Sequence, residues 1–63
     1  MRSSLKEIVD RAAADAERIT IRHALEATGG NKSQAARLLG VDYKTLHLKM
    51  KRYAIEASQF RAK

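Results

Sequence analysis

The chain has 63 residues, and its 13 Lys or Arg outnumber its 7 Asp or Glu to give a formal net charge of +6 at pH 7. A chain of this length forms one small domain that buries only about 60% of its unfolded surface, so we expect association with a second copy to add stability. The absence of Cys excludes disulfides and thiolate metal sites. No apolar run approaches the roughly 18 residues of a membrane span or has the form of a signal peptide, so we expect a cytoplasmic protein without membrane contact.

The charge is unevenly distributed along the chain. Residues 1–30 hold five basic and five acidic side chains, which cancel. After position 30 the only acids are Asp42 and Glu56, and the basic residues are Lys32, Arg37, Lys44, Lys49, Lys51, Arg52, Arg61 and Lys63. The C-terminal half is therefore the part that would attract a polyanion.

Abundant Ala and the absence of Pro indicate an all-α fold whose breaks fall at the glycines. Ser4 followed by Glu7 fits a capping box, so a first helix should begin at about Leu5. It should run to Thr28, where two glycines stop it. At about 36 Å this helix is longer than the globule requires, so it should either bend near residues 14–17 or project from the domain.

The first helix carries two apolar faces when residues are placed at 100° intervals. Ile21 and Leu25 lie on one face and should pack against the helices that follow. The other face has no partner within the chain, and we predict that it pairs with a second copy in an antiparallel or crossed helical bundle. The predicted dimer interface consists of Leu5, Ile8, Val9, Ala12, Ala16 and Ile19. The alternative is a kink that folds residues 5–15 back onto their own domain.

A second helix is predicted from Lys32 to Leu39, capped by Asn31. Its inner face consists of Ala35, Ala36 and Leu39, and the small Ala36 lets the next helix cross closely. Gly40 suits a backbone turn with positive φ, and Val41 closes the corner. This arrangement predicts a helix-turn-helix.

A third helix should follow, capped by Asp42, with Leu46, Met50 and Tyr53 facing inward. The opposite side of this helix would face DNA, and the helix would serve as a recognition helix, because the major groove admits a helix whose first turns touch base edges. Lys44 and His47 can donate to guanine acceptors. The predicted base-contacting residues are Tyr43, Lys44, His47 and Leu48.

Leu48 is either a contact to a thymine methyl group or simply an exposed side chain. Residues at the start of the second helix suit a backbone phosphate, and those on the flanks of the third helix neutralise others. The predicted phosphate contacts are Asn31, Lys32, Ser33, Thr45, Lys49, Lys51 and Arg52.

Residues 28–55 resemble the C-terminal Fis-type helix-turn-helix domain of the NtrC family, the bacterial enhancer-binding activators of sigma-54 promoters, and more distantly Fis itself. Their sequence is TGGNKSQAARLLGVDYKTLHLKMKRYAI. The resemblance is specific over residues 21–55 and loose over residues 1–20. It implies one four-helix domain in which residues 1–28 form two dimerisation helices, residues 31–55 form the helix-turn-helix, and residues 56–63 are a basic tail or a helix extension.

The same resemblance implies roles for individual residues. Asn31, Ser33 and Thr45 would contact phosphates, and the base-facing positions would be Asp42, Tyr43, Lys44 and His47. The implied partner is double-stranded DNA with an inverted-repeat site, bound by a homodimer in the nucleoid. In a longer protein an ATPase domain would contact the sigma-54 RNA polymerase. The alternatives are a free-standing Fis-like architectural protein and a basic helical protein-interaction module.

The sequence departs from the family pattern at four positions. Tyr43, His47 and Leu48 replace residues that are commonly basic, so the DNA site should differ from those of relatives. Ala54 stands where the family usually has Gly. Because Ala with positive φ costs roughly 1 kcal/mol, we expect the third helix to continue toward Glu56 or Ala57.

An enzyme is the least supported class. His23 and His47 are 24 positions apart, and the sequence has no Cys, no paired carboxylates and no Gly-rich phosphate loop. We therefore expect no catalytic site, no metal and no cofactor.

Overall fold

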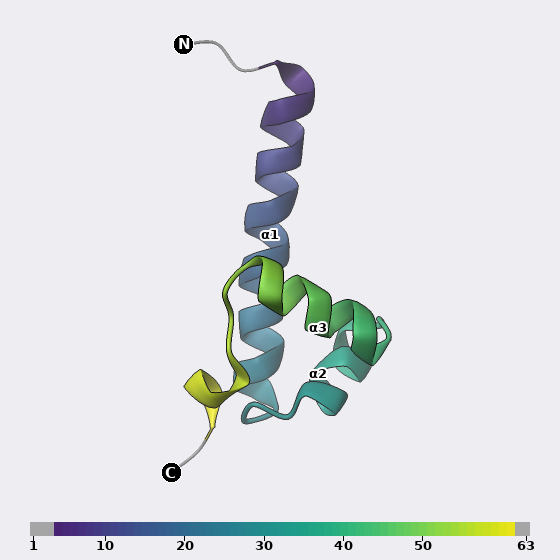
Figure 1. The fold of residues 1–63 in the computed structure, drawn as a ribbon, viewed down its shortest axis with the longest axis vertical. Coiled ribbons are helices and arrows are strands. Elements are labelled where there is room, and N and C mark those ends of the chain that lie inside the picture. The colour runs from purple at the N-terminus through teal and green to yellow at the C-terminus, as the bar shows by residue number, and fades with distance from the viewer. Residues whose placement is uncertain (1–3, 62–63) are drawn as a thin grey trace.

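The computed structural model describes residues 4–61, which form three α-helices and one short 3-10 helix and contain no strand. The ends of the predicted dimerisation region and basic tail, residues 1–3 and 62–63, lie outside the described residues. Helix α2 packs against both α1 and α3, and η1 packs against α1 (Figure 1). The elements are α1 Leu5–Ala27, α2 Lys32–Leu39, α3 Tyr43–Arg52 and η1 Ala57–Phe60. The expected all-α class is confirmed.

Helix α1 begins at the predicted capping box. The Glu7 amide donates to Ser4 Oγ at 3.1 Å, and the Ser4 amide donates to Glu7 Oε1 at 2.9 Å. The helix then runs unbroken for 23 residues, because no Gly or Pro interrupts it. The expected division of residues 1–28 into two helices is therefore wrong for the described residues. Figure 1 shows the N-terminal half of α1 projecting beyond α2 and α3, which excludes the kinked alternative.

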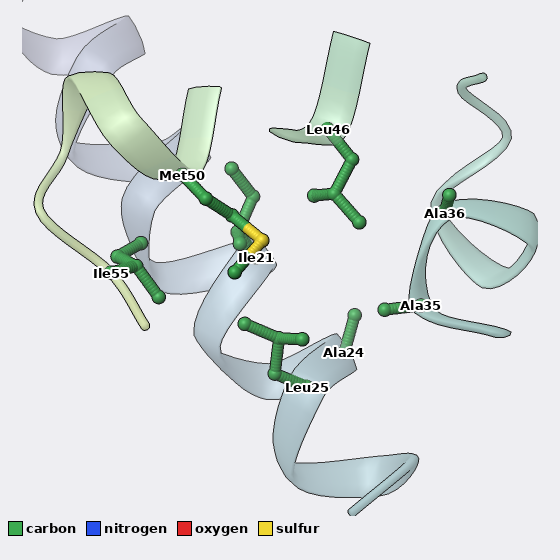
Figure 2. Packing of buried hydrophobic residues seen from close by; sticks show 8 residues of the cluster. All are labelled: Ile21, Ala24, Leu25, Ala35, Ala36, Leu46, Met50 and Ile55. Carbon is green, nitrogen blue, oxygen red and sulfur yellow. The ribbon is translucent and has the colours of Figure 1, made fainter. Parts of the chain in front are cut away.

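The core gathers at the C-terminal half of α1. Leu25 of α1 and Leu46 of α3 are its largest fully buried side chains. In Figure 2, Ala24 points toward Ala35 of α2, where small side chains on both helices permit close approach. Among residues 4–61 the buried apolar side chains are Ile21, Ala24, Leu25, Ala35, Ala36, Leu46, Met50 and Ile55. The predicted inner faces of all three helices are confirmed.

The helix-turn-helix is formed as predicted. Asn31 Oδ1 accepts a hydrogen bond from the Gln34 amide at 3.0 Å and caps α2. Gly40 ends the helix with a φ of 74°, and the Val41 amide donates to the Ala36 carbonyl oxygen at 3.0 Å. Asp42 occupies the N-cap position of α3, but its side chain makes no capping hydrogen bond, so the predicted side-chain cap is wrong.

The end of α3 differs from expectation. The helix stops at Arg52, and Ala54 adopts a φ of 55°. The Ile55 amide then donates to the Met50 carbonyl oxygen at 2.9 Å, and the Ile55 side chain is only 4% exposed. Burial of an Ile side chain contributes roughly 1.5–3 kcal/mol, which exceeds the cost of a left-handed Ala. The predicted extension toward Glu56 or Ala57 is therefore wrong.

Replacement of Ala54 by Gly should stabilise the protein by up to about 1 kcal/mol, because Gly adopts positive φ without strain. Urea unfolding at fixed protein concentration measures the change in free energy. The control is Ala13→Gly on the exposed surface of α1, which should lose roughly 1 kcal/mol. Equal losses in both variants would contradict the left-handed backbone at Ala54.

Candidate nucleic-acid interface

The exposed face of α3 lies opposite the buried Leu46 and Met50. Leu48 is 57% exposed there, with no core for its side chain to join. Lys44, His47 and Lys51 are exposed on the same face, and Tyr43 and Arg52 are exposed on its flanks. Asp42, just before the helix, is exposed as well. The predicted base-facing residues are thus all accessible at the start and centre of α3.

Two aromatic rings stack on each other in the first turns of α3. The Tyr43 and His47 rings are stacked, with centroids 6.2 Å apart and planes at 11°. The Lys32 ammonium of α2 lies 5.8 Å from the Tyr43 ring centroid, a cation–π contact. These contacts join the beginnings of α2 and α3, so the side chains of both helices are presented together.

The beginning of α2 borders an open polar hollow. Asn31 and Ser33 are exposed and Lys32 is half-buried. The side-chain oxygen of Asn31 is already engaged by the Gln34 amide, so its capping role is established. The hollow is lined by Thr28, Gly29, Gly30, Asn31, Lys32, Ser33, Tyr43 and Arg61.

Two predicted phosphate contacts lie on the other flank of α3, toward α1. Thr45 is half-buried there. Lys49 Nζ forms an ion pair with Glu17 Oε2 of α1 at 2.9 Å, and the Tyr53 hydroxyl donates to Glu17 Oε1. The structure thus places Lys49 away from the beginning of α2 and pairs its charge with Glu17.

Sequence reasoning missed Glu17. Its signal was available, because Glu17 stands four residues before Ile21 and so lies on the helix face that the core occupies. Hydrogen bonds from Tyr53 and then Lys49 hold the pKa of the Glu17 carboxyl below its ordinary value of 4.5. The bond to Glu17 raises the pKa of the Tyr53 hydroxyl above its ordinary value of 10.0. The three side chains therefore link the central part of α1 to the end of α3.

The predicted dimer face is open in the single chain. Leu5 is 78% exposed, and Ile8, Val9 and Ile19 are each more than half exposed. Ala12 and Ala16 are exposed on the same side. Ala16 also borders an apolar hollow that continues toward Leu39 and Val41 at the helix-turn-helix corner. This apolar face of α1 is therefore uncovered in the single chain.

Two further findings concern residues 4–61. No group of three or more His, Cys, Asp or Glu side chains in that range could hold a metal ion. No helix in the same range is long and apolar enough to cross a membrane. Leu38 of α2 is also exposed, and sequence reasoning counted Arg61 among the basic residues without assigning it a contact.

Comparison with known proteins gives consistent matches. The family described as bacterial regulatory protein, Fis family, matches residues 12–53. The chain is 55% identical over 38 residues to the transcriptional regulatory protein ZraR of Salmonella typhimurium (strain LT2) and to that of Salmonella typhi. The match covers 60% of this chain and 9% of each relative, so the chain spans a small fraction of their length. No solved structure matches the chain.

Glu17→Gln should lower the melting temperature at pH 7, because it removes the carboxylate that Tyr53 and Lys49 contact. A folded-state pKa below the ordinary value means that this carboxylate stabilises the fold above pH 4.5, and that the benefit is lost as pH falls through the lowered pKa. The gap between the variant and the unmodified protein should therefore narrow in acid. Thermal melts across this range measure it, with Glu26→Gln on the same helix as the control. A difference in melting temperature that does not change with pH would contradict stabilisation by the ionised Glu17 carboxylate.

Proposed function

Because the chain belongs to the Fis family of bacterial regulatory proteins, we propose that it binds duplex DNA sequence-specifically as a homodimer, with α3 in the major groove. The observation that carries this proposal is the exposed polar face of α3, held by the Gly40 turn and backed by the buried Leu46 and Met50. The major groove is wide enough for a helix presented in this way.

The first turns of α3 contact the bases in this proposal. Lys44 and His47 supply donors for guanine O6 and N7, and the Tyr43 hydroxyl can reach a base edge or a phosphate. Asp42 stands at the start of the helix, where a carboxylate can accept from the cytosine amino group. Leu48 contacts a thymine methyl group. The stack of Tyr43 on His47 supports this arrangement, because it holds both rings in one orientation.

The proposed contacts to the DNA backbone surround this face. Lys32 and Ser33, with Asn31, contact a phosphate on one side, and Thr45 contacts one on the other. Lys51 and Arg52 add charge along α3. Lys49 is not among these contacts in our proposal, because its ammonium is paired with Glu17. The cluster of cations accounts for affinity, and the base-facing residues account for specificity.

Dimerisation uses the projecting half of α1. The exposed apolar side chains Leu5, Ile8 and Val9 of that half continue along the helix to Ile19 and, with the small Ala12 and Ala16, form the self-complementary surface of the proposed dimer. A two-fold axis through this surface presents two copies of α3 to successive major grooves about 34 Å apart. The binding site is then an inverted repeat.

We further propose that the chain is the enhancer-binding effector domain of an NtrC-family activator of sigma-54 promoters, acting in the bacterial cytoplasm at the nucleoid. The specific resemblance over residues 21–55 supports this, as does the similarity to relatives named as transcriptional regulatory proteins. In the full-length protein an ATPase domain would contact the sigma-54 RNA polymerase.

The logarithm of DNA affinity should fall linearly and steeply with the logarithm of salt concentration, because binding neutralises several phosphates.

Lys44→Ala should weaken preference at one base position by about 1–3 kcal/mol. Fluorescence anisotropy with labelled duplexes measures both effects. The control is Lys6→Ala, which removes the same charge from the distant half of α1. Absence of duplex binding even at low salt would reject the proposal.

Ile8→Asp should convert the dimer to a monomer, because it places a charge in an apolar interface. Sedimentation equilibrium measures the association state, and the monomer should retain only weak, largely unspecific DNA binding. Lys6→Asp is the control, since it introduces the same side chain beside the interface but off the apolar face. A monomeric unmodified protein at high micromolar concentration would remove the basis for two-fold recognition.

A further inference from the structure

The segment after α3 is anchored to the domain. Ile55 is buried in the core, and Ala57 and Phe60 pack against it. The Arg22 guanidinium of α1 lies 5.2 Å from the Phe60 ring centroid, a cation–π contact that holds η1 to α1. The backbone leading to Arg61 is thus placed by packing, and the helix-turn-helix is followed by an ordered element (Figure 1).

Gly30 brings this segment against the loop between α1 and α2. It is buried and has a φ of 84°. A Cβ at this position would come within 2.6 Å of the Ala57 carbonyl oxygen and 3.1 Å of Arg61 Cγ. Because real Cβ atoms do not approach backbone oxygen so closely, only Gly permits the contact. The close approach sets Arg61 beside the beginning of α2.

Cationic side chains from three segments converge as a result. Lys32 of α2, Lys51 of α3 and Arg61 line one open hollow beside the recognition helix, together with His47 and Ser58. Glu56 is the one acid among the described residues that line it. Lys32 and Arg61 also line the polar hollow that includes Asn31 and Tyr43. Arg61 therefore lies between two hollows whose other lining residues include Tyr43 and His47 of the recognition face.

We propose that Arg61, from the segment that follows the helix-turn-helix, completes with Lys32 and Lys51 an additional binding site for a backbone phosphate of DNA, beyond the contacts assigned above. His47 belongs both to this hollow and to the base-facing surface, so a strand that borders the groove beside His47 passes over the cations. The Arg fork binds phosphate oxygens with paired donors, which Lys cannot do. The inference rests on the proposed function and extends its interface beyond residue 55.

The test compares Arg61→Gln with Lys6→Gln, which removes the same charge far from the site. Anisotropy titrations over a range of salt concentrations use a mixed-sequence duplex and a duplex carrying a selected site. Arg61→Gln should weaken binding to both duplexes by a similar factor, roughly three- to tenfold, and reduce the salt slope by about one unit. Arg61→Lys should restore the salt slope, because the slope depends on the number of charges, but only part of the affinity, because Lys lacks the paired donors of the Arg fork. Lys6→Gln should leave both quantities nearly unchanged.

A second readout separates a phosphate contact from a structural effect. In ethylation interference, the unmodified protein should show one sensitive phosphate per half-site that Arg61→Gln no longer shows, while the other sensitive phosphates persist. Circular dichroism melts establish that the variant is folded. If the unmodified protein binds DNA but Arg61→Gln behaves as Lys6→Gln does, the additional site is rejected and the proposed function stands. If the unmodified protein binds no duplex, both are rejected.

Discussion

The structure depends on the burial of one half of α1 against α2, α3 and the segment after α3. The buried apolar side chains among residues 4–61 all lie between positions 21 and 55. This core occupies one side of α1 and one side of α3, and it leaves the opposite side of α3 and the N-terminal half of α1 in solvent. The two surfaces to which we assign DNA binding and dimerisation are thus the parts of α3 and α1 that the single core leaves exposed.

Continuity of α1 connects these two surfaces mechanically. The same helix carries the exposed apolar residues near Leu5, the Glu17 carboxylate that contacts Lys49 and Tyr53, and the buried Leu25. A helix without Gly or Pro is stiff over this length. In the proposed dimer, pairing of the α1 helices would therefore set the distance and orientation of the two α3 helices. The contacts of Glu17 with Lys49 and Tyr53 would hold each α3 to its own α1.

Much of the fold could be predicted from the sequence because its signals are local. The Ser4 and Asn31 caps, the Gly40 turn and the inward stripe on α3 all involve residues within about four positions of one another. The exposed face of α3 followed from the same periodicity. These features fix the candidate base-facing residues as a group on one surface.

The errors arose where distant residues decide the outcome. Ala54 was expected to continue the helix, but burial of Ile55 among core residues from other elements favours a left-handed Ala. The ion pair of Lys49 with Glu17, 32 positions away, was not foreseen for the same reason, and the phosphate contact expected of Lys49 stays an untested prediction. The family resemblance supplied two helices in residues 1–28, whereas this sequence contains no residue that would divide α1.

The central claim is that two copies of α3, related by the pairing of α1, read a symmetric DNA site. Selection of binding sites from random duplexes tests it most directly, since the enriched sequences report half-site, spacing and symmetry together. Two-fold recognition by α3 predicts an inverted repeat whose half-site centres lie one helical turn, roughly 34 Å, apart. Enrichment of a single asymmetric site, or no enrichment over the starting pool, would contradict it.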